Sequence, residues 1–207
     1  MAIAAPSLLT AGGRRILFVM ATTHEYGAAL RARIEPLITG VGPVEAGVVT
    51  AAALAALPEL PDLVVSLGSA GSRRKPLGEV FQISQVSWRD MDASRLGFPR
   101  GVTPFLDLEP VQPLATPIDW PMATLSTGAD IVGGDEYDAI DADMVEMETW
   151  AVLRACQLFG IPLTGLRGVS DGPGELEALG GWTHLLELLD ERLAEAVDVL
   201  LAGWSEG

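Results

Sequence analysis

Short, continuous apolar runs alternate along this chain with longer segments in which apolar residues recur every three or four positions. The runs have the length of strands and lack polar alternation, so they predict strands that are covered on both faces. We expect such strands at residues 16–21 and 63–67, a mostly apolar strand at 163–169, and further strands at 37–41, 78–86 and 122–126. Because helical segments separate them, the pattern predicts an α/β fold with a central, mostly parallel or mixed twisted sheet that is flanked by helices.

The helical pattern and its breaks divide the chain further. We expect helices at about 22–34, from Pro43 to about 57, through the apolar positions 152–159 up to Gly160, and at about 183–204. Residues 1–14 resemble a loose leader, and residues 15–207 form a single domain. The segment 87–116 is rich in Pro, Gly, Asp and Arg and predicts a long irregular loop, of the kind that is usually functional or mobile.

Charge and cysteine content narrow the class of protein. The chain has 28 acidic and 13 basic residues and a formal net charge of −15, which argues against nucleic acid or an anionic membrane as a partner. A nucleoside without phosphate needs no cationic groove and remains compatible. With Cys156 as its one cysteine and no apolar run of about 18 residues, the chain is expected to be cytoplasmic. His24 and His184 have no metal-ligand spacing, so neither metal nor cofactor is expected.

Polar and small residues gather where the expected strands end. Glu25 follows the first strand, Gly68-Ser69-Ala70-Gly71 follows the third, and Ser170-Asp171 ends the last. Ligands of open α/β sheets bind outside the carboxyl ends of the strands, so these residues mark a candidate site. Taken alone, Glu25 is explained as well by compensation of a helix dipole, and Asp171 by a turn.

These segments together resemble the nucleoside phosphorylase superfamily, and within it the 5′-methylthioadenosine/S-adenosylhomocysteine nucleosidases. The resemblance covers most of residues 15–203. Its segments, in the order of the family, are 20–25, Gly40-Val41-Gly42, 68–71, 125–128, 145–148 and 169–171. Met147-Glu148 followed about two dozen residues later by Ser170-Asp171 is the most specific of these features.

The resemblance implies hydrolysis of the N-glycosidic bond of a purine nucleoside, with a separate role for each end of the site. Asp171 would protonate N7 of the leaving adenine, and Ser170 would orient it. Glu25 would hold and activate the attacking water, with help from Ser69. A carboxyl that acts as an acid at neutral pH needs a raised pKa, which burial supplies.

The remaining implied contacts are to the sugar and the base. Glu148 would bind the ribose hydroxyls and stabilise the positively charged sugar, and Met147 would pack against the ribose face. Glu146 and Ile131 are the other expected substrate contacts, with Ile131 against the purine. The family further implies a homodimer, and residues 89–105 would supply the site for the 5′ substituent and the dimer contact.

Four alternatives remain open on the sequence, one of which is a purely structural acidic α/β domain. A phosphorylase would need cationic side chains for phosphate, and Arg73 and Arg74 are the candidates. Another nucleoside, such as a futalosine-type one, could be the substrate of the hydrolase. A catalytically silent nucleoside-binding protein would keep the fold. The chain also departs from the family by a shorter segment before residue 37 and by Trp150, a large residue that is expected to narrow the pocket.

Overall fold

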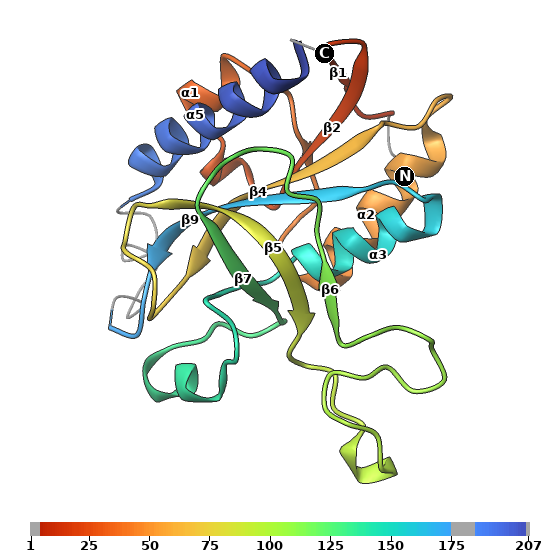
Figure 1. Cartoon of the computed structure of the whole chain (residues 1–207), viewed down its shortest axis with the longest axis vertical. Helices are drawn as coiled ribbons and strands as arrows, with labels where there is room; N and C mark the ends of the chain where they lie inside the picture. The colour runs from red at the N-terminus through yellow and green to blue at the C-terminus, as the bar shows by residue number, and fades with distance from the viewer. Residues whose placement is uncertain (1–4, 175–184, 206–207) are drawn as a thin grey trace.

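A mixed sheet lies between two layers of helices in the computed structural model, which describes residues 5–174 and 185–205. Helices α1 (Ala28–Arg31) and α5 (Leu186–Ser205) cover one face of the sheet, and α2 (Pro43–Ala56) and α3 (Thr149–Phe159) cover the other (Figure 1). This arrangement confirms the predicted α/β fold class. No helix in the described ranges is long and apolar enough to span a membrane.

The sheet has both parallel and antiparallel neighbours. Its strands are β1 (Leu9–Ala11), β2 (Arg14–Met20), β3 (Leu37–Ile38), β4 (Leu63–Gly71), β5 (Val80–Trp88), β6 (Val111–Pro113), β7 (Met122–Thr127), β8 (Met144–Glu146) and β9 (Leu163–Asp171). The pairs β2–β4, β4–β9, β5–β7 and β7–β8 are parallel, whereas β5–β9 and β4–β8 are antiparallel. Since β4, β9, β5, β7 and β8 pair in turn, the sheet curls into a closed ring around the ends of these strands.

Strand β2 shows why the apolar runs are continuous. Leu17 and Val19 pack into the core below α2 and α3, whereas Ile16, Phe18 and Met20 pack into the core below α1 and α5. All five are at most 2% exposed. Burying each such side chain contributes about 1.5–3 kcal/mol, so two-sided burial of β2 is a large part of what holds the layers together.

The helix predicted over residues 22–34 is wrong. A short 3-10 turn, η1 (Thr23–Glu25), is followed by extended backbone at Gly27 and then by α1, which is a single turn. The reason is tertiary. The carboxylate of Asp190 on α5 accepts hydrogen bonds from the backbone N–H groups of Gly27, Ala29 and Leu30. These N–H groups therefore do not need acceptors within a continuous helix.

Several strands are longer or earlier than expected. Leu9–Ala11, within the range assigned to a leader, pairs with β2 in a hairpin whose turn, Gly12-Gly13, has positive φ at both residues. The expected turn at 68–71 is instead the end of β4, because it continues its pairing with β9. The C-terminal helix begins at Leu186, and its expected start at residue 183, like His184, lies outside the described residues.

Candidate active site

The carboxyl ends of β2, β4, β5, β7, β8 and β9 surround a cleft of about 560 Å³, a size typical of small-molecule sites. Its lining comprises Ala21, Thr22, Glu25, Val41, Ser69, Ala70, Gly71, Arg89, Asp130, Ile131, Val132, Val145, Glu146, Met147, Glu148 and Asp171. Seven of the eight residues expected from the sequence are therefore brought to one cleft. The eighth, Ser170, is buried behind it and touches Asp171.

Glu25 is held at the floor of the cleft by the end of β4. Its Oε1 accepts hydrogen bonds from the backbone N–H of Ser69 at 2.7 Å and from the Ser69 hydroxyl at 2.5 Å. Burial raises the pKa of Glu25 above the usual carboxyl value, against the opposing effect of the Ser69 hydrogen bonds and the Arg167 charge. A buried carboxylate with a raised pKa is a stronger base, which suits proton abstraction.

A second, small cavity adjoins the cleft beside Glu25. It has about 10 Å³ of room, close to the space that one water molecule needs. Ala21, Glu25, Ser69 and Glu148 line both spaces, so the small cavity adjoins the cleft beside two carboxyl groups. A water held there would lie against a base and a hydroxyl, and it would face the interior of the cleft.

Arg167 is a site residue that the sequence analysis missed. It lies within β9, is 2% exposed and lines the small cavity. Its Nη2 donates to Ser66 Oγ at 2.8 Å, to Thr149 Oγ1 at 2.7 Å and to Glu146 Oε2 at 3.2 Å. Its Nε has no hydrogen-bond partner within the described ranges. The available signal was an arginine inside an otherwise apolar strand, because such a charge is rarely buried without a role.

Glu146 is fully engaged by protein groups. One carboxylate oxygen accepts the backbone N–H groups of Glu148 and Thr149 and the hydroxyl of Thr149, and it also pairs with Arg167. The other oxygen accepts the Thr127 hydroxyl at 2.5 Å. Burial acts to raise the pKa of Glu146, but the Arg167 charge and these hydrogen bonds hold it below the usual value. Glu146 therefore fixes the turn before α3 as an ionised group.

We expect Arg167→Met to destabilise the fold strongly. The substitution leaves the Glu146 carboxylate buried without its counter-charge, and breaking such a pair from one side costs about 3–5 kcal/mol. Denaturant unfolding followed by circular dichroism measures this loss. The exposed pair Arg33–Asp198 supplies the control, because Arg33→Met should cost no more than about 1 kcal/mol. Equal losses of unfolding free energy in the two variants would show that the buried pair stabilises the fold no more than the exposed pair does.

Glu148 is positioned by the Gly40-Val41-Gly42 segment. Its Oε1 accepts the backbone N–H of Gly42 at 2.8 Å. Gly40 and Gly42 have φ of 90° and 95°, a region that residues with side chains rarely occupy, so the glycines are required for this turn. Burial raises the pKa of Glu148 to about 7, and the negative charge of Glu146 contributes to this rise. Met147, next to it, is half-buried and forms part of the wall of the cleft.

Asp171 lines the cleft at the ends of β4 and β9. Its Oδ1 accepts the Ser170 hydroxyl at 2.5 Å, and the side chain is only 4% exposed. Gly71 permits this placement, because a β-carbon there would lie 2.7 Å from Asp171 Oδ2 and would clash with the Tyr137 hydroxyl. The carboxyl is thus oriented by Ser170 and buried against the ends of β4 and β9.

The other predicted contacts fall in different places. Ile131 is 64% exposed and stands at the rim of the cleft. Trp150 does not narrow the pocket, because its side chain is buried in the core below α2 and α3. Arg89, which was not expected in this role, lines the cleft and donates to the carbonyl groups of Ser126, Asp130 and Glu146, so it ties the ends of β5, β7 and β8 together.

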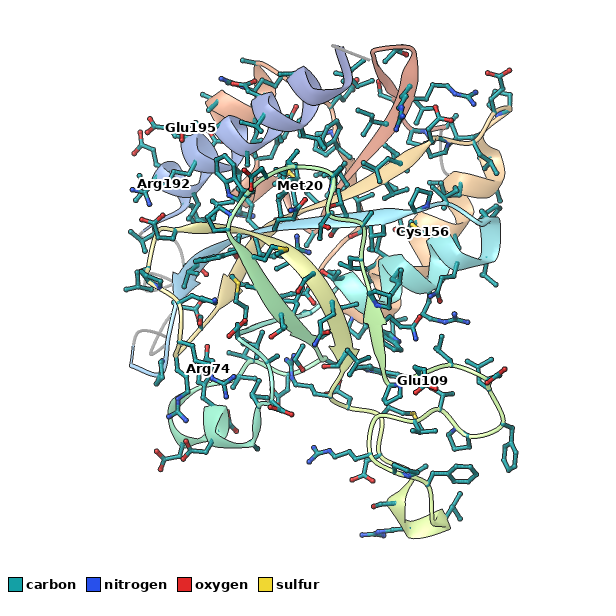
Figure 2. All side chains as sticks on the ribbon, in the orientation of Figure 1. Met20, Arg74, Glu109, Cys156, Arg192 and Glu195 are labelled. Atoms are coloured by element: carbon teal, nitrogen blue, oxygen red, sulfur yellow. The ribbon has the colours of Figure 1, made fainter. Side chains whose placement is uncertain are left out.

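Arg73 and Arg74 lie outside both cavities. Both are exposed after the end of β4, where Arg73 pairs with Asp138, and Figure 2 shows Arg74 at the edge of the molecule near η3 (Gly134–Ala139). The two arginines considered for a phosphate site, Arg73 and Arg74, therefore do not line either space beside Glu25. Among the described residues, His, Cys, Asp and Glu form no cluster that could hold a metal ion.

Known proteins resemble this chain along most of its length. A sequence model of the phosphorylase superfamily matches residues 124–202. A 5′-methylthioadenosine/S-adenosylhomocysteine nucleosidase of Haemophilus influenzae is 30% identical over 155 residues, which span 66% of this chain and 67% of that protein. The nucleosidase of the same name from Actinobacillus succinogenes is 29% identical over 185 residues, or 80% of this chain and 79% of that protein.

Solved structures share the fold. A futalosine hydrolase mutant of Helicobacter pylori superposes with a TM-score of 0.77 at 20% identity and covers 90% of this chain and 98% of its own. A 5′-methylthioadenosine/S-adenosylhomocysteine nucleosidase of Colwellia psychrerythraea, solved with adenine, superposes with a TM-score of 0.77 at 19% identity and covers 91% of this chain and 95% of its own.

Proposed function

Because this chain belongs to the phosphorylase superfamily, we propose that it hydrolyses the N-glycosidic bond of a purine nucleoside and releases adenine. The favoured substrates are 5′-methylthioadenosine and S-adenosylhomocysteine, after which its sequence relatives are named. The observation that carries the proposal is the cavity for one water, which lies between Glu25, Ser69 and Arg167 and adjoins a nucleoside-sized cleft.

Asp171 is the proposed general acid. As the bond between C1′ and N9 breaks, its electron pair moves onto the purine, and a proton from Asp171 at N7 makes the base a neutral leaving group. The Ser170 hydrogen bond to Oδ1 fixes the orientation of the carboxyl. Burial at the strand end keeps solvent from competing for this proton.

Glu25, which lines both the cleft and the small cavity, is the proposed general base. The water loses a proton to Glu25 as its oxygen forms the new bond to C1′, so the products are free base and free sugar. Ser69 holds Glu25 and lines the water cavity, and the Arg167 charge limits repulsion among the surrounding carboxylates. Met147 and Ile131 are the proposed apolar contacts to the ribose and the purine.

Glu148 is proposed to bind the ribose hydroxyls and to stabilise the positive charge that develops on the sugar. Glu146 completes this group as a positioning residue, since its oxygens hold the backbone of Glu148 and the side chains of Thr127 and Arg167. The sequence predicts that Glu146 contacts the substrate. We assign it instead to the support of Glu148.

Water is favoured over phosphate as the acceptor. A cavity of about 10 Å³ has room for one water and is far too small for a phosphate ion. Arg167, the one arginine among the described residues that line it, is already engaged by Ser66, Glu146 and Thr149. Arg73 and Arg74 lie elsewhere on the surface.

Base release from methylthioadenosine tests the proposal. Purified protein should release adenine and free sugar in phosphate-free buffer, and added phosphate should not change the rate. Release that requires phosphate would make the protein a phosphorylase. No release from methylthioadenosine or adenosylhomocysteine, but release from futalosine, would move the activity to that substrate.

The pH dependence of kcat/KM should report Glu148. Its raised pKa of about 7 means that the carboxyl is protonated below this pH and ionised above it. Because the ionised form is the one that binds hydroxyl groups and stabilises the sugar cation, kcat/KM should fall as the pH drops through about 7. Steady-state rates across the acidic range measure this limb. A profile that stays level well below pH 7 would contradict the role of Glu148.

We further propose that the protein is a cytoplasmic homodimer that takes part in methionine salvage. The segment between β5 and β6 supports the dimer, because it presents apolar side chains to solvent, with Phe105 97% exposed and Leu96 73% exposed. The single cysteine, which is buried, suits a reducing compartment. Sedimentation of a dimer is expected, and a monomer at all concentrations would contradict it.

A further inference from the structure

We propose that Asp190, on α5, is a positioning residue for Glu25, an inference that rests on the proposed function of the site. Asp190 lies far from the chemistry in sequence and does not line the cleft. It is 5% exposed, and its carboxylate contacts the segment that carries Glu25. Asp190 thus links the C-terminal helix α5 to the segment that carries Glu25.

The contact replaces the local structure that this segment lacks. Asp190 Oδ1 accepts the N–H groups of Gly27 at 3.0 Å and of Leu30 at 3.1 Å, and Oδ2 accepts that of Ala29 at 2.7 Å. Gly27, the first flanking residue of α1, has no side chain to cap the helix. A carboxylate from α5 therefore satisfies the donors that a local cap would otherwise bind.

The shape of the segment is matched to this carboxylate. A β-carbon on Gly27 would lie 2.5 Å from both the Asp190 Cγ and Oδ2, so glycine is required there for lack of space, although its φ of −87° is open to any residue. Gly27 and Asp190 thus fit each other directly. This close fit fixes the backbone only two residues beyond Glu25.

The position of that backbone matters because one oxygen of the Glu25 carboxyl accepts two hydrogen bonds at once. Its Oε1 binds both the N–H and the hydroxyl of Ser69, at 2.7 Å and 2.5 Å. The η1 turn, which ends at Glu25, has three residues and cannot hold this position by itself. A shift of about 1 Å in a catalytic group lowers rates by up to about 100-fold, so loss of the Asp190 contact should slow the water attack.

Two substitutions disturb the contact from opposite sides. Asp190→Asn places an amide N–H against one of the backbone N–H groups, and Gly27→Ala pushes a methyl group against the carboxylate. Each should lower kcat by about 10- to 100-fold with little change in KM, because the nucleoside itself does not touch Asp190. Asp198→Asn is the matched control, since it removes an exposed α5 contact to Arg33 and should leave kcat unchanged.

The same substitutions in a Glu25→Gln background separate positioning from general damage. If Asp190 acts through Glu25, Asp190→Asn should cause no further loss of residual activity there. A second loss of equal size, a rise in KM alone, or wild-type kcat in both Asp190→Asn and Gly27→Ala would overturn the inference. An inactive wild-type protein would instead contradict the proposed function. Should Asp190→Asn fail to fold, Gly27→Ala carries the test.

Discussion

Asp171→Asn should abolish turnover and leave the fold intact. Asparagine has nearly the same shape as aspartic acid and can still accept the Ser170 hydrogen bond that Oδ1 accepts in the native protein. It cannot donate an acidic proton to the purine, and general acid catalysis contributes about 10²–10⁴-fold. We therefore expect kcat to fall by at least about 100-fold, with adenine binding and the unfolding midpoint close to those of the wild type.

Initial rates of adenine release measure this effect, and circular dichroism checks the fold. Asp62→Asn is a suitable control, because Asp62 is exposed beside the amino end of β4, far along the strand from the cleft, where it accepts the Arg15 N–H. That variant should retain full activity. Unchanged turnover in Asp171→Asn would remove the acid role from this residue.

Glu25→Gln should suppress hydrolysis far more than it weakens binding. The amide cannot accept the proton of the attacking water, so a loss of about 10²–10⁴-fold in kcat is expected. The nucleoside remains bound by the other walls of the cleft, so the Kd of a non-hydrolysed analogue should change little. Equal losses in kcat and in binding would indicate that Glu25 has a structural role.

A second variant acts on the same water without changing any charge. Gly68 lines the small cavity, and a β-carbon there would lie 3.4 Å from Glu25 Oε2, an ordinary contact distance. Gly68→Ala should therefore fold normally but crowd the water. A reduced kcat in Gly68→Ala, together with the loss in Glu25→Gln, would assign the effect to the water and not to the carboxylate charge alone.

The layered fold could be predicted from the sequence because burial on two faces leaves a direct trace. The runs 16–20 in β2 and 63–67 in β4 are apolar except for Ser66, since alternate side chains enter different cores. Strands β6 and β8 were missed, because strands of three residues are too short to show a periodicity. The segment after β2 was wrongly predicted as a helix because its hydrogen-bond acceptor, Asp190, is more than 150 residues away.

The site was predictable only where local signals coincided. Glu25, Glu148 and Asp171 stood at strand or helix ends, and the structure brings all three to the cleft. Arg167 was missed because its partners, Ser66, Glu146 and Thr149, come from two other parts of the chain. Glu146 was expected to touch substrate, but its carboxylate oxygens already accept hydrogen bonds from Thr127, Thr149 and Arg167.

We propose that a water molecule beside Glu25, and not phosphate, attacks the sugar. Hydrolysis of methylthioadenosine in water enriched with oxygen-18, followed by mass spectrometry of the released sugar, tests it most directly. We predict one heavy oxygen in the sugar, at the anomeric position, with the same product when phosphate is present. A sugar phosphate without the heavy oxygen, formed only when phosphate is added, would contradict the account.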